Sequence, residues 1–443
     1  MNKKFMYSFG ATALAIAYMA FSTYIMFFYV DVMKLPVRLA GLAILIYAIW
    51  NAVNDPLAGF ISDNTKSRWG RRLPYLIFSA LPLCVIFFLL WIPPFNGLEN
   101  STALFIYFLI LICLFDGLYT LIAVNWTALF PEMFQPFRER ININTVRQGF
   151  WLVGLLIGVA VPPFLYSAWG WWSMGLSFSI IILLLLLMAI YGSRERKEFS
   201  LETQPHALKA LRETINNKSF IILALGNLLL QYSFTMILAV IPFFAKYILK
   251  CDQRVVSLLV VAAFLAALPM LFVWKRLALR YGAKNCLLTS MAFLFVWLAP
   301  LLFIDNFYQV VFIAAMIGAG VAGFILVADV MLADVIDEDE LNNGVRREGM
   351  YFGMNNFFTR LAIGLEAFSL SAVFVMTGHN SYVFTQSREF YVGLRILIAG
   401  LPMIALASGF AIMLFYPLAG RKMKEMGARV EAMHLKKGVE KNG

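Results

Sequence analysis

Residues 54–74 read NDPLAGFISDNTKSRWGRRLP, and this stretch ends an apolar run with a basic link that turns at a glycine. A second basic link with a glycine, WKRLALRYGAK at 274–284, follows a later apolar run. The two links occupy corresponding places in the two halves of the chain. This internal repeat predicts two parallel halves, the arrangement in which transporters bind substrate between the halves near the bilayer midplane.

The composition excludes a water-soluble globule. Of 443 residues, 61% are hydrophobic and 14% are charged, whereas soluble domains carry roughly 25% charged residues. Twelve membrane spans of about 22 residues would use most of the apolar residues that the chain provides. We therefore predict an all-α membrane protein with twelve transmembrane helices in two six-helix halves.

Hydropathy places the spans of the first half near 5–30, 37–63, 74–93, 102–130, 143–169 and 172–192. It places those of the second half near 219–247, 253–274, 285–304, 307–337, 347–377 and 393–417. The first apolar run continues through Phe28, so we interpret it as a helix rather than a signal peptide. The expected organisation is an N-terminal half at 1–192, a cytoplasmic linker at 193–218, a C-terminal half at 219–417 and a basic cytoplasmic tail at 418–443.

The distribution of basic residues predicts the orientation. Most Lys and Arg residues fall in the termini, the linker and every second loop, and few fall in the alternate loops. Because cytoplasmic loops carry the excess of positive charge, both termini are expected in the cytoplasm of a multi-pass protein of the cell (inner) membrane. The same reasoning explains the net charge of +11 without a nucleic-acid partner.

The linker and the tail are polar. Ala207, Leu208, Leu211 and Ile215 recur at helical spacing, which predicts either a short amphipathic helix on the membrane face or a solvated linker. The basic residues of the tail are expected to contact anionic membrane lipid.

Cysteine and histidine chemistry is sparse. The four cysteines are far apart in the sequence, and all three histidines fall in loops or the tail. No disulfide framework, cofactor or metal site beyond a coupling Na⁺ is therefore predicted. An intramembrane enzyme would need a nucleophile and base or metal ligands at bilayer depth, and no such set is visible, so an enzyme is not expected.

Short motifs indicate a family. The first link contains Asn54-Asp55-Pro56, Asp63-x-Thr65 and Arg68-Trp69-Gly70-Arg71. Further along are ALFPE at 128–132, MLADVID at 331–337 and RREGMY at 346–351. Together these motifs resemble the melibiose permease-like glycoside–pentoside–hexuronide:cation symporter family of the major facilitator superfamily. The resemblance covers nearly the whole chain and implies the major facilitator fold.

Charged residues at the predicted inner helix ends are candidates for gating. They are Asp63, Arg68, Arg71, Arg72, Asp334 and Asp337. Charge-assisted hydrogen bonds among such groups can hold one conformation and break in another. The alternative, a purely topogenic role, accounts for the arginines but not for the neighbouring aspartate.

Ionisable residues inside apolar runs are costly and therefore need a partner or a function. They are Asp55, Asp116, Arg147, Asp329, Arg360 and Glu366. Asp55 lies one helical turn after Asn51, so one face offers carboxylate and amide oxygens. Oxygen ligands suit a hard cation, and a carboxylate can instead carry a proton. An alternative is that Asp55 only pairs with an arginine.

The family resemblance sharpens the cation site. It implies two carboxylates one turn apart on the second helix and a threonine on the fourth, which correspond here to Asn51, Asp55 and Thr120. Counting from the helix ends places Asp116 level with Asn51 and Thr120 level with Asp55. We therefore hypothesise that Asp116 supplies the missing carboxylate, while the alternative is a structural bridge between Asp116 and Arg147.

The expected substrate site departs from the family pattern. The two carboxylates that bind sugar hydroxyls in the melibiose carrier correspond to Ala15 and Ala123, whereas Arg147 and Arg360 match functional basic residues. The remaining candidate contacts are Trp126, Gln148, Tyr18, Asn227, Gln231 and Glu366. Guanidinium groups bind carboxylates through paired hydrogen bonds, which favours an acidic sugar such as a hexuronide. If Asp329 and Glu366 neutralise the arginines, the site is neutral instead.

The predicted function is secondary active symport of a sugar or glycoside with Na⁺ or H⁺ by alternating access. The alternative within the carrier class is a cation-coupled carrier of a lysolipid or another amphiphile, and a channel is not expected. The partners are a small-molecule substrate and membrane lipid, and we expect a monomer.

Overall fold

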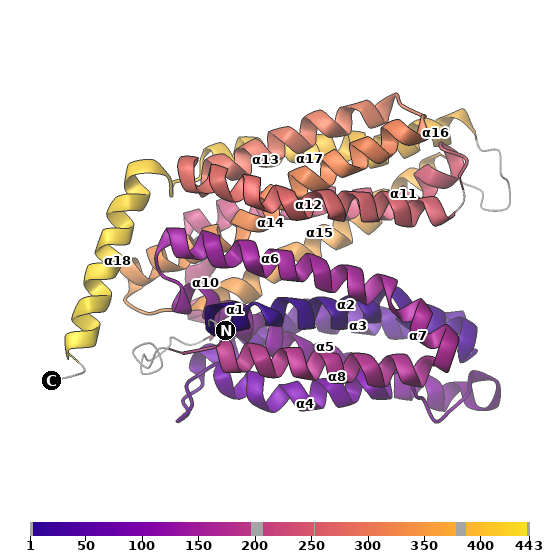
Figure 1. Cartoon of the computed structure of the whole chain (residues 1–443), viewed down its shortest axis with the longest axis horizontal. Coiled ribbons are helices and arrows are strands. Elements are labelled where there is room, and N and C mark those ends of the chain that lie inside the picture. The colour runs from indigo at the N-terminus through magenta and orange to yellow at the C-terminus, as the bar shows by residue number, and fades with distance from the viewer. Residues whose placement is uncertain (1–2, 196–206, 252, 378–386, 441–443) are drawn as a thin grey trace. The chain divides into compact units, whose positions relative to one another are not determined.

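The computed structural model describes residues 3–195, 207–251, 253–377 and 387–440. All regular secondary structure in these residues is helical. The chain forms two compact units, coloured along the sequence in Figure 1. Unit 1 holds Met1–Leu211, Asn343–Phe357 and Leu435–Gly443, and unit 2 holds Arg212–Asn342 and Phe358–His434.

Unit 1 is a bundle of long helices. In order they are α1 (Lys3–Tyr7), α2 (Phe9–Phe27), the π-helical turn η1 (Phe28–Val32), α3 (Val37–Asn64), α4 (Leu73–Leu89), α5 (Gly97–Met133), α6 (Phe137–Ala160), α7 (Pro162–Trp169) and α8 (Trp171–Gly192). Helix α2 packs against α6 and α8, while α5 packs against α3 and α4. Most of these helices run side by side in Figure 1, so their facing side chains form the core of the unit.

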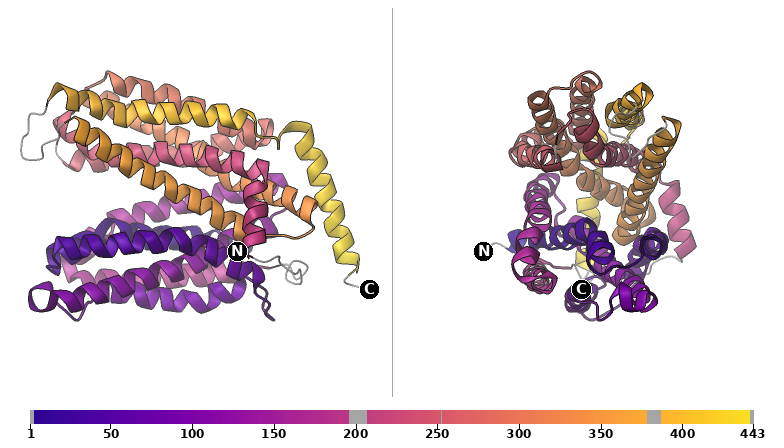
Figure 2. Two further views of the ribbon diagram at one scale, coloured as in Figure 1. Left: turned by 180° about the vertical axis from the view of Figure 1, so that it is seen from behind. Right: turned by 90° about the vertical axis from the view of Figure 1, so that its right-hand side faces the viewer.

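Unit 2 contains most of the remaining helices. They are α10 (Ala207–Asn216), α11 (Lys218–Tyr247), α12 (Gln253–Tyr281), α13 (Ala283–Leu298), the 3-10 turn η2 (Ala299–Leu302), α14 (Phe307–Asn343), α15 (Glu348–Met376), α16 (Arg388–Arg395), the π-helical turn η3 (Ile396–Gly400), α17 (Leu401–Leu414) and α18 (Gly420–Glu440). Helix α17 packs against α11 and α13, as Figure 2 shows from behind. The first turns of α15, through Phe357, belong to unit 1.

The predicted membrane architecture is confirmed. Among the described residues, eleven helical segments are long and apolar enough to cross a membrane, and α4 adds a shorter apolar helix. Each of the twelve predicted spans therefore corresponds to a helix. Several helices extend beyond their predicted apolar run; α5 begins at Gly97 and α14 continues to Asn343. Hydropathy detects only the apolar part of a helix, whereas tertiary contacts also stabilise polar turns at its ends.

The connections also differ in detail from the expectation. The span predicted at 143–169 is two helices, α6 and α7, which meet at Val161 before two prolines. The amphipathic stretch expected at 207–215 is helical, as α10, while residues 196–206 of the expected linker lie outside the described residues. The tail was expected only to be basic, and most of it forms α18.

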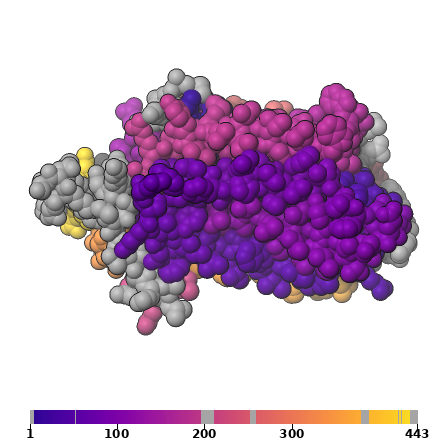
Figure 3. Space-filling model, turned by 90° about the horizontal axis from the view of Figure 1, so that it is seen from below, coloured from indigo at the N-terminus to yellow at the C-terminus, as the bar shows by residue number. Residues whose placement is uncertain are grey.

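The outer surface of the helices is strongly apolar. Figure 3 shows one face on which purple and magenta residues of unit 1 predominate. Large exposed hydrophobic side chains on the outer faces of α4 and α8 include Ile77, Phe78, Leu81, Val85, Ile180, Ile181, Leu184 and Leu187. A soluble protein does not expose such continuous apolar surface, so these faces are the ones that meet lipid.

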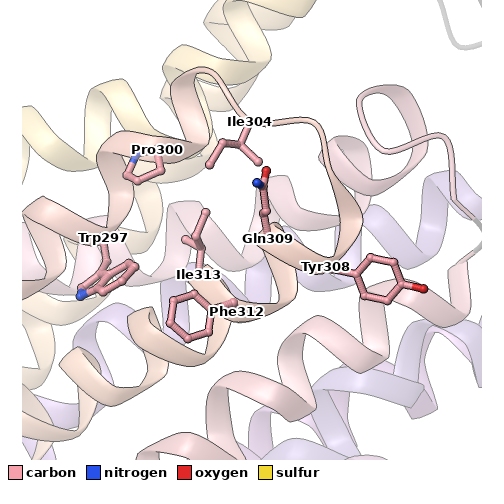
Figure 4. A pocket seen from close by; sticks show the side chains of 7 residues that line it. All are labelled: Trp297, Pro300, Ile304, Tyr308, Gln309, Phe312 and Ile313. Carbon is pink, nitrogen blue, oxygen red and sulfur yellow. The ribbon is translucent and has the colours of Figure 1, made fainter.

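One shallow pocket in unit 2 lies where α13, η2 and α14 meet. Its volume is about 360 Å³, and Figure 4 shows its lining side chains. They are Trp297, Pro300, Ile304, Tyr308, Gln309, Phe312 and Ile313. None of the candidate site residues is among them, so this pocket is separate from the predicted cation and substrate residues.

Candidate functional site

Helices α3 and α5 face each other through two layers of polar side chains. In one layer the Thr120 hydroxyl donates a hydrogen bond of 2.9 Å to Oδ1 of Asp55. In the other, Nδ2 of Asn51 donates to Oδ1 of Asp116 at 2.5 Å. Asn51 and Asp55 are one turn apart on α3, and Asp116 and Thr120 are one turn apart on α5. The register between the two helices is therefore the one that counting from the helix ends predicts.

Two more side chains complete the layer around Asp116. Nδ2 of Asn54 donates to Oδ2 of Asp116 at 2.5 Å, and the Tyr47 hydroxyl donates to Oδ1 at 3.3 Å. Tyr47 also accepts a hydrogen bond of 3.1 Å from Asn51. Sequence reasoning assigned no role to Tyr47 and Asn54, although 47, 51, 54 and 55 share one face of a helix and the spacing alone could have indicated them.

The two carboxylates and most of the four side chains that bond them are removed from solvent, while Tyr47 is half-buried. Asp55 and Thr120 are each 1% exposed, and Asp116 is 3% exposed. Carboxylate, amide and hydroxyl groups gathered in one buried place are the ligand types that suit a hard cation. Rotating either asparagine amide would turn its oxygen toward the same space, because the two ends of an amide have nearly the same shape.

The backbone of α3 beside Asp55 is tightly packed against the start of α15. A Cβ added to Gly353 would lie 2.6 Å from the Asp55 carbonyl oxygen, and one added to Gly59 would lie 2.2 Å from the Gly349 carbonyl oxygen. Only glycine allows two helix backbones to approach so closely. The cation-site candidates and the first turn of α15 are therefore in direct mechanical contact within unit 1.

A buried charge cluster occupies one end of unit 1. Its members are Asp63, Arg71, Arg72, Glu132, Glu195, Arg346 and Glu348, whose side chains are at most 5% exposed. Nη2 of Arg72 bridges Asp63 Oδ1 at 2.7 Å and Glu348 Oε2 at 2.6 Å. Arg71 also donates to Glu348 Oε2, at 2.9 Å. Residues more than 270 positions apart in the sequence thus share one ion-pair network.

Asp63 also binds the first turn of α15 through the backbone. Its two carboxylate oxygens accept hydrogen bonds from the amides of Gly349, at 3.1 Å, and Met350, at 2.9 Å. A carboxylate at a helix N-terminus meets unpaired amide donors and the positive end of the helix dipole. Asp63 therefore joins the end of α3 to the start of α15.

Four members of the cluster had no predicted gating role. Glu132, Arg346 and Glu348 lie in quoted motifs, and Glu195 lies in the expected linker. Arg346 donates to the carbonyl of Pro131 at 3.2 Å and pairs with Glu348. The motifs mark these positions, but only the folded chain shows that they converge on the two arginines.

Arg71 remains charged in this environment. Burial opposes its positive charge, but the carboxylates of Glu348, Glu132, Asp63 and Glu195 outweigh the burial, so the pKa of Arg71 is raised above its usual value. By contrast, Arg68 is exposed and its guanidinium lies 4.5 Å from the Trp69 ring centroid, apart from the cluster. Of the three arginines predicted as gating residues, Arg71 and Arg72 lie inside the network and Arg68 does not.

Among the substrate candidates of unit 1, Arg147 is held between aromatic rings. Its Cζ atom lies 4.6 Å from the Phe130 centroid and 5.3 Å from that of Trp126, and the residue is 2% exposed. Trp126 is itself fixed, because its indole N–H donates to the Tyr7 carbonyl at 3.1 Å and its ring stacks on Tyr7. Aromatic faces stabilise a guanidinium through its positive charge.

The other candidates of unit 1 are Gln148, on α6 with Arg147, and Tyr18, on α2. Gln148 follows Arg147 and is 9% exposed. Tyr18 on α2 contacts the ring of Tyr119, with centroids 5.8 Å apart. The structure thus brings Trp126 to Arg147 as a supporting side chain, and it identifies Phe130 as a second ring beside this arginine and Tyr7 as the residue that holds Trp126.

The remaining candidates lie in unit 2. Asn227 and Glu366 are 4% and 9% exposed, while Gln231 and Arg360 are half-buried. Tyr232, next to Gln231, donates a hydrogen bond of 3.0 Å to the Ser369 hydroxyl. These residues lie on α11 and α15, which carry polar groups at mid-helix positions.

The two gating candidates of unit 2 are also buried. Asp334 and Asp337 are 3% and 6% exposed, near the end of α14. Burial, together with the carboxylates of Asp334 and Glu338, holds the pKa of Tyr416 well above its usual value. The Tyr416 hydroxyl donates to the Met331 carbonyl at 3.3 Å. The end of α14 is thus a second buried acidic region.

An all-helical chain with about twelve apolar spans, two units and intramembrane carboxylates defines a membrane transporter of the major facilitator type rather than an enzyme. The chain belongs to the MFS/sugar transport protein family, which it matches over residues 6–420. Its relatives include members of the glycoside–pentoside–hexuronide family, so the family predicted from the motifs is confirmed.

Three relatives illustrate the range of the family. The isoprimeverose transporter of Lactiplantibacillus pentosus is 25% identical, with 94% of this chain and 88% of the relative covered. The glucuronide carrier protein homolog of Escherichia coli K12 is 24% identical, covering 96% and 94%. The sodium-dependent lysophosphatidylcholine symporter 1 of Gallus gallus is 23% identical, covering 95% and 87%.

The fold is shared with solved transporters. A bacterial homologue of the iron transporter ferroportin, in an outward-facing state, superimposes with a TM-score of 0.72 at 13% identity, over 94% of this chain and 99% of the other. At this identity the similarity establishes the fold and nothing about the substrate.

Proposed function

We propose that the chain imports a sugar or glycoside together with Na⁺ or H⁺ by alternating access. The observation that carries this proposal is the pair of buried carboxylates, Asp55 and Asp116, on facing helices. Carboxylates inside the membrane are expensive unless they serve a purpose, and a coupling cation provides one. Relatives that transport isoprimeverose and glucuronides support the substrate class.

The coupling site that we propose consists of Asp55, Asp116, Asn51 and Thr120, with Asn54 as an added ligand. Their carboxylate, amide and hydroxyl oxygens are the ligand types that hard cations prefer. A proton would instead reside on one of the carboxylates. Either ion would cancel one of the two carboxylate charges and so change the stability of the contact between α3 and α15.

The substrate site that we propose includes Arg147, supported by Trp126, with Gln148 on the same helix and Tyr18 on the neighbouring α2. A guanidinium edge recognises a planar carboxylate through two parallel hydrogen bonds. This chemistry favours an acidic sugar, such as a hexuronide. Arg360, Asn227, Gln231 and Glu366 are the proposed contributions of the second half of the chain.

We further propose that the buried charge cluster is the inner gate. Its bonds between Arg71, Arg72 and Glu348 must break for α3 and α15 to separate, and the network can re-form when they return. Asp334 and Asp337 are the proposed counterparts in the second half. In this proposal both termini are cytoplasmic, in keeping with the distribution of basic residues, and one chain is the transporting unit.

The experiment uses purified carrier in sealed liposomes. Uptake of radiolabelled methyl glucuronide and of isoprimeverose is measured with an inward Na⁺ gradient, an inward proton gradient and no gradient. We expect accumulation of at least one sugar with one of the two gradients. Uptake that never exceeds equilibration under either gradient, while a known symporter accumulates sugar in parallel, would contradict symport.

The second candidate is a lysolipid carrier. The lysophosphatidylcholine symporter of Gallus gallus is about as similar to this chain as the glucuronide carrier is. Ala15 and Ala123 would suit an apolar tail better than a sugar. Sodium-dependent transfer of a fluorescent lysophosphatidylcholine across the same liposomes, without sugar accumulation, would favour this candidate.

A further inference from the structure

The carboxylate of Glu195 is bound by the backbone at the start of α4. Its Oε1 accepts a hydrogen bond of 2.7 Å from the Arg71 amide. Its Oε2 accepts from the amides of Arg72, at 3.0 Å, and Leu73, at 3.4 Å. Three successive amides thus converge on one side chain, and that side chain is only 3% exposed.

The local backbone is shaped to receive this carboxylate. Gly70 has a φ of +103°, a conformation that side chains other than glycine rarely adopt. A Cβ on Gly70 would lie 2.2 Å from Oε2 of Glu195. The first amides of a helix have no partner within the helix, and α4 has no capping side chain of its own. Glu195 supplies the missing acceptor and meets the positive end of the helix dipole.

The bound amides belong to the gate arginines themselves. Arg71 and Arg72 use their side chains to bind Glu348 and Asp63, and their backbone amides to bind Glu195. Arg71 Nε lies 3.7 Å from the same Glu195 carboxylate. Because the amides fix the backbone from which both guanidinium groups project, the position of Glu195 sets where those groups can reach.

Glu195 is in turn fixed to a different helix. It lies three residues after the end of α8, and the Ser193 hydroxyl between them donates to the Ala189 carbonyl at 2.8 Å. The Arg194 amide contacts the Met133 sulfur at 3.5 Å, at the end of α5. Glu195 therefore joins the ends of α8 and α5, where the chain leaves for its second half, to the loop that carries the arginines.

We propose that Glu195 is a positioning residue of the inner gate, which holds Arg71 and Arg72 in the closed arrangement and ties gate opening to the end of α8. Glu195 itself touches neither cation nor substrate. When the gate opens, the loop must either carry Glu195 with it or release three charge-assisted hydrogen bonds. This inference depends on the proposed gate, and its test therefore measures gate opening without substrate.

The test compares the alkylation of two thiols by N-ethylmaleimide in the purified full-length carrier. Met350 is 4% exposed beside Asp63, so Met350→Cys reports opening of the gate. The natural Cys84 within α4 is also 4% exposed and reports general loosening of the unit. Each thiol is studied in a protein whose other cysteines are replaced by serine. Its alkylation rate is compared between the protein with Glu195 intact and the same protein with Glu195→Gln. The matched control is Glu431→Gln, at an exposed position of α18.

We expect Glu195→Gln to accelerate alkylation at position 350 about tenfold, the effect of losing roughly one hydrogen bond to a charged group. Alkylation of Cys84 should not change, and Glu431→Gln should alter neither rate. Glu195→Asp keeps the charge on a shorter side chain, so it should accelerate alkylation at position 350 less than Glu195→Gln does. The aspartate variant also serves as the test if the glutamine variant does not fold.

Two results would overturn the inference. Equal acceleration at both thiols would mean that Glu195 only stabilises the unit as a whole. Unchanged alkylation at position 350 in both Glu195 variants would mean that the carboxylate does not hold the gate. Rapid alkylation at position 350 with Glu195 intact would show that the gate itself is wrongly assigned, a different failure from the other two.

Discussion

Asp55 is the residue on which coupling depends most directly. Asp55→Asn keeps the size of the side chain and an acceptor for Thr120 but removes the charge. We expect accumulation to fall to a ratio of about one, because a carrier that does not bind its cation can still cycle down a gradient. Uptake and counterflow in liposomes distinguish these two behaviours, and counterflow should persist. Normal accumulation by the variant would remove Asp55 from the coupling site.

Asp116 allows a stricter test, since its partner Asn51 stands where the family pattern places a carboxylate. Asp116→Asn should abolish accumulation as Asp55→Asn does. Adding Asn51→Asp returns one carboxylate to the same layer, at a side chain that bonds Asp116 at 2.5 Å. Partial recovery of accumulation in the double variant is expected.

The control for this pair is Asn51→Asp alone, which places two carboxylates side by side. Repulsion between them should raise the affinity for a cation or proton and slow its release. If the double variant recovers nothing while remaining folded and able to exchange substrate, Asp116 is a structural charge only.

The sequence predicts the relative heights of four of these side chains for a simple reason. Asn51 and Asp55 lie within α3, and Asp116 and Thr120 lie in the part of α5 that follows the non-helical backbone at Asn100. Counting residues along these two helical stretches therefore gives the relative heights of the four side chains. Tyr47 was missed because its hydroxyl has no charge to mark it inside an apolar run. Glu348 could not be placed, because its distance from Arg72 depends on tertiary packing that no local period describes.

At the scale of elements, the contact between α3 and α15 predicts a large effect of one methyl group. Gly59→Ala would place a Cβ 2.2 Å from the Gly349 carbonyl oxygen, so the helices must separate. Overpacking of this kind costs about 1–3 kcal/mol, and the cost falls on the closed gate. We expect Gly59→Ala to accelerate alkylation of the reporter thiol that Met350→Cys introduces, and to weaken substrate accumulation.

Gly41→Ala is the matched control on the same helix. Nothing lies within 4 Å of a Cβ at Gly41, and alanine is favoured over glycine in a helix by about 0.5–1 kcal/mol. This variant should transport normally and unfold at an equal or higher temperature. The same impairment in both variants would show that helix flexibility, rather than the close contact with α15, controls the gate.

The sequence predicts that a helix exists more accurately than it predicts the residues at which the helix begins and ends. The apolar runs of α8 and α11 are long and continuous, and their predicted limits agree with the structure within about two residues. The polar end of α14 was expected to stop at 337 but continues to Asn343, because its buried acidic residues are held by the fold. Hydropathy contains no information about such contacts.

At the scale of the whole molecule, the two halves repeat in sequence but differ in chemistry. The link at 54–74 contains an aspartate among its arginines, whereas the link at 274–284 is only basic. The second half places its acids on α14 instead, at Asp334 and Asp337. A transporter with unlike halves can bind its coupling cation in one half and leave other roles to the second half. Binding of the cation would then change the affinity for the substrate, and binding of the substrate would change the affinity for the cation by the same factor.

The last prediction concerns the substrate that such a molecule selects. The guanidinium of Arg147 lies 4.6 Å from the Phe130 ring centroid and 5.3 Å from that of Trp126. Arg147→Lys keeps the positive charge but loses the planar pair of donors, so a carboxylate loses a bidentate partner while a sugar hydroxyl loses a single bond. We expect the apparent affinity for methyl glucuronide to fall about tenfold to a hundredfold, since hydrogen bonds to charged groups contribute about 1.5–3 kcal/mol.

The measurement is competition for uptake by methyl glucuronide and by its neutral glucoside analogue. Lys246→Arg on α11 is the matched control for exchanging a lysine and an arginine, since the Lys246 ammonium also lies beside an aromatic ring, 4.7 Å from that of Tyr247. The acidic sugar should lose far more affinity than the neutral one only in Arg147→Lys. Equal losses for both sugars would contradict an anionic substrate. Arg147 would then act as a hydrogen-bond donor to a neutral glycoside, and the aromatic rings around it would serve to keep a buried charge in place.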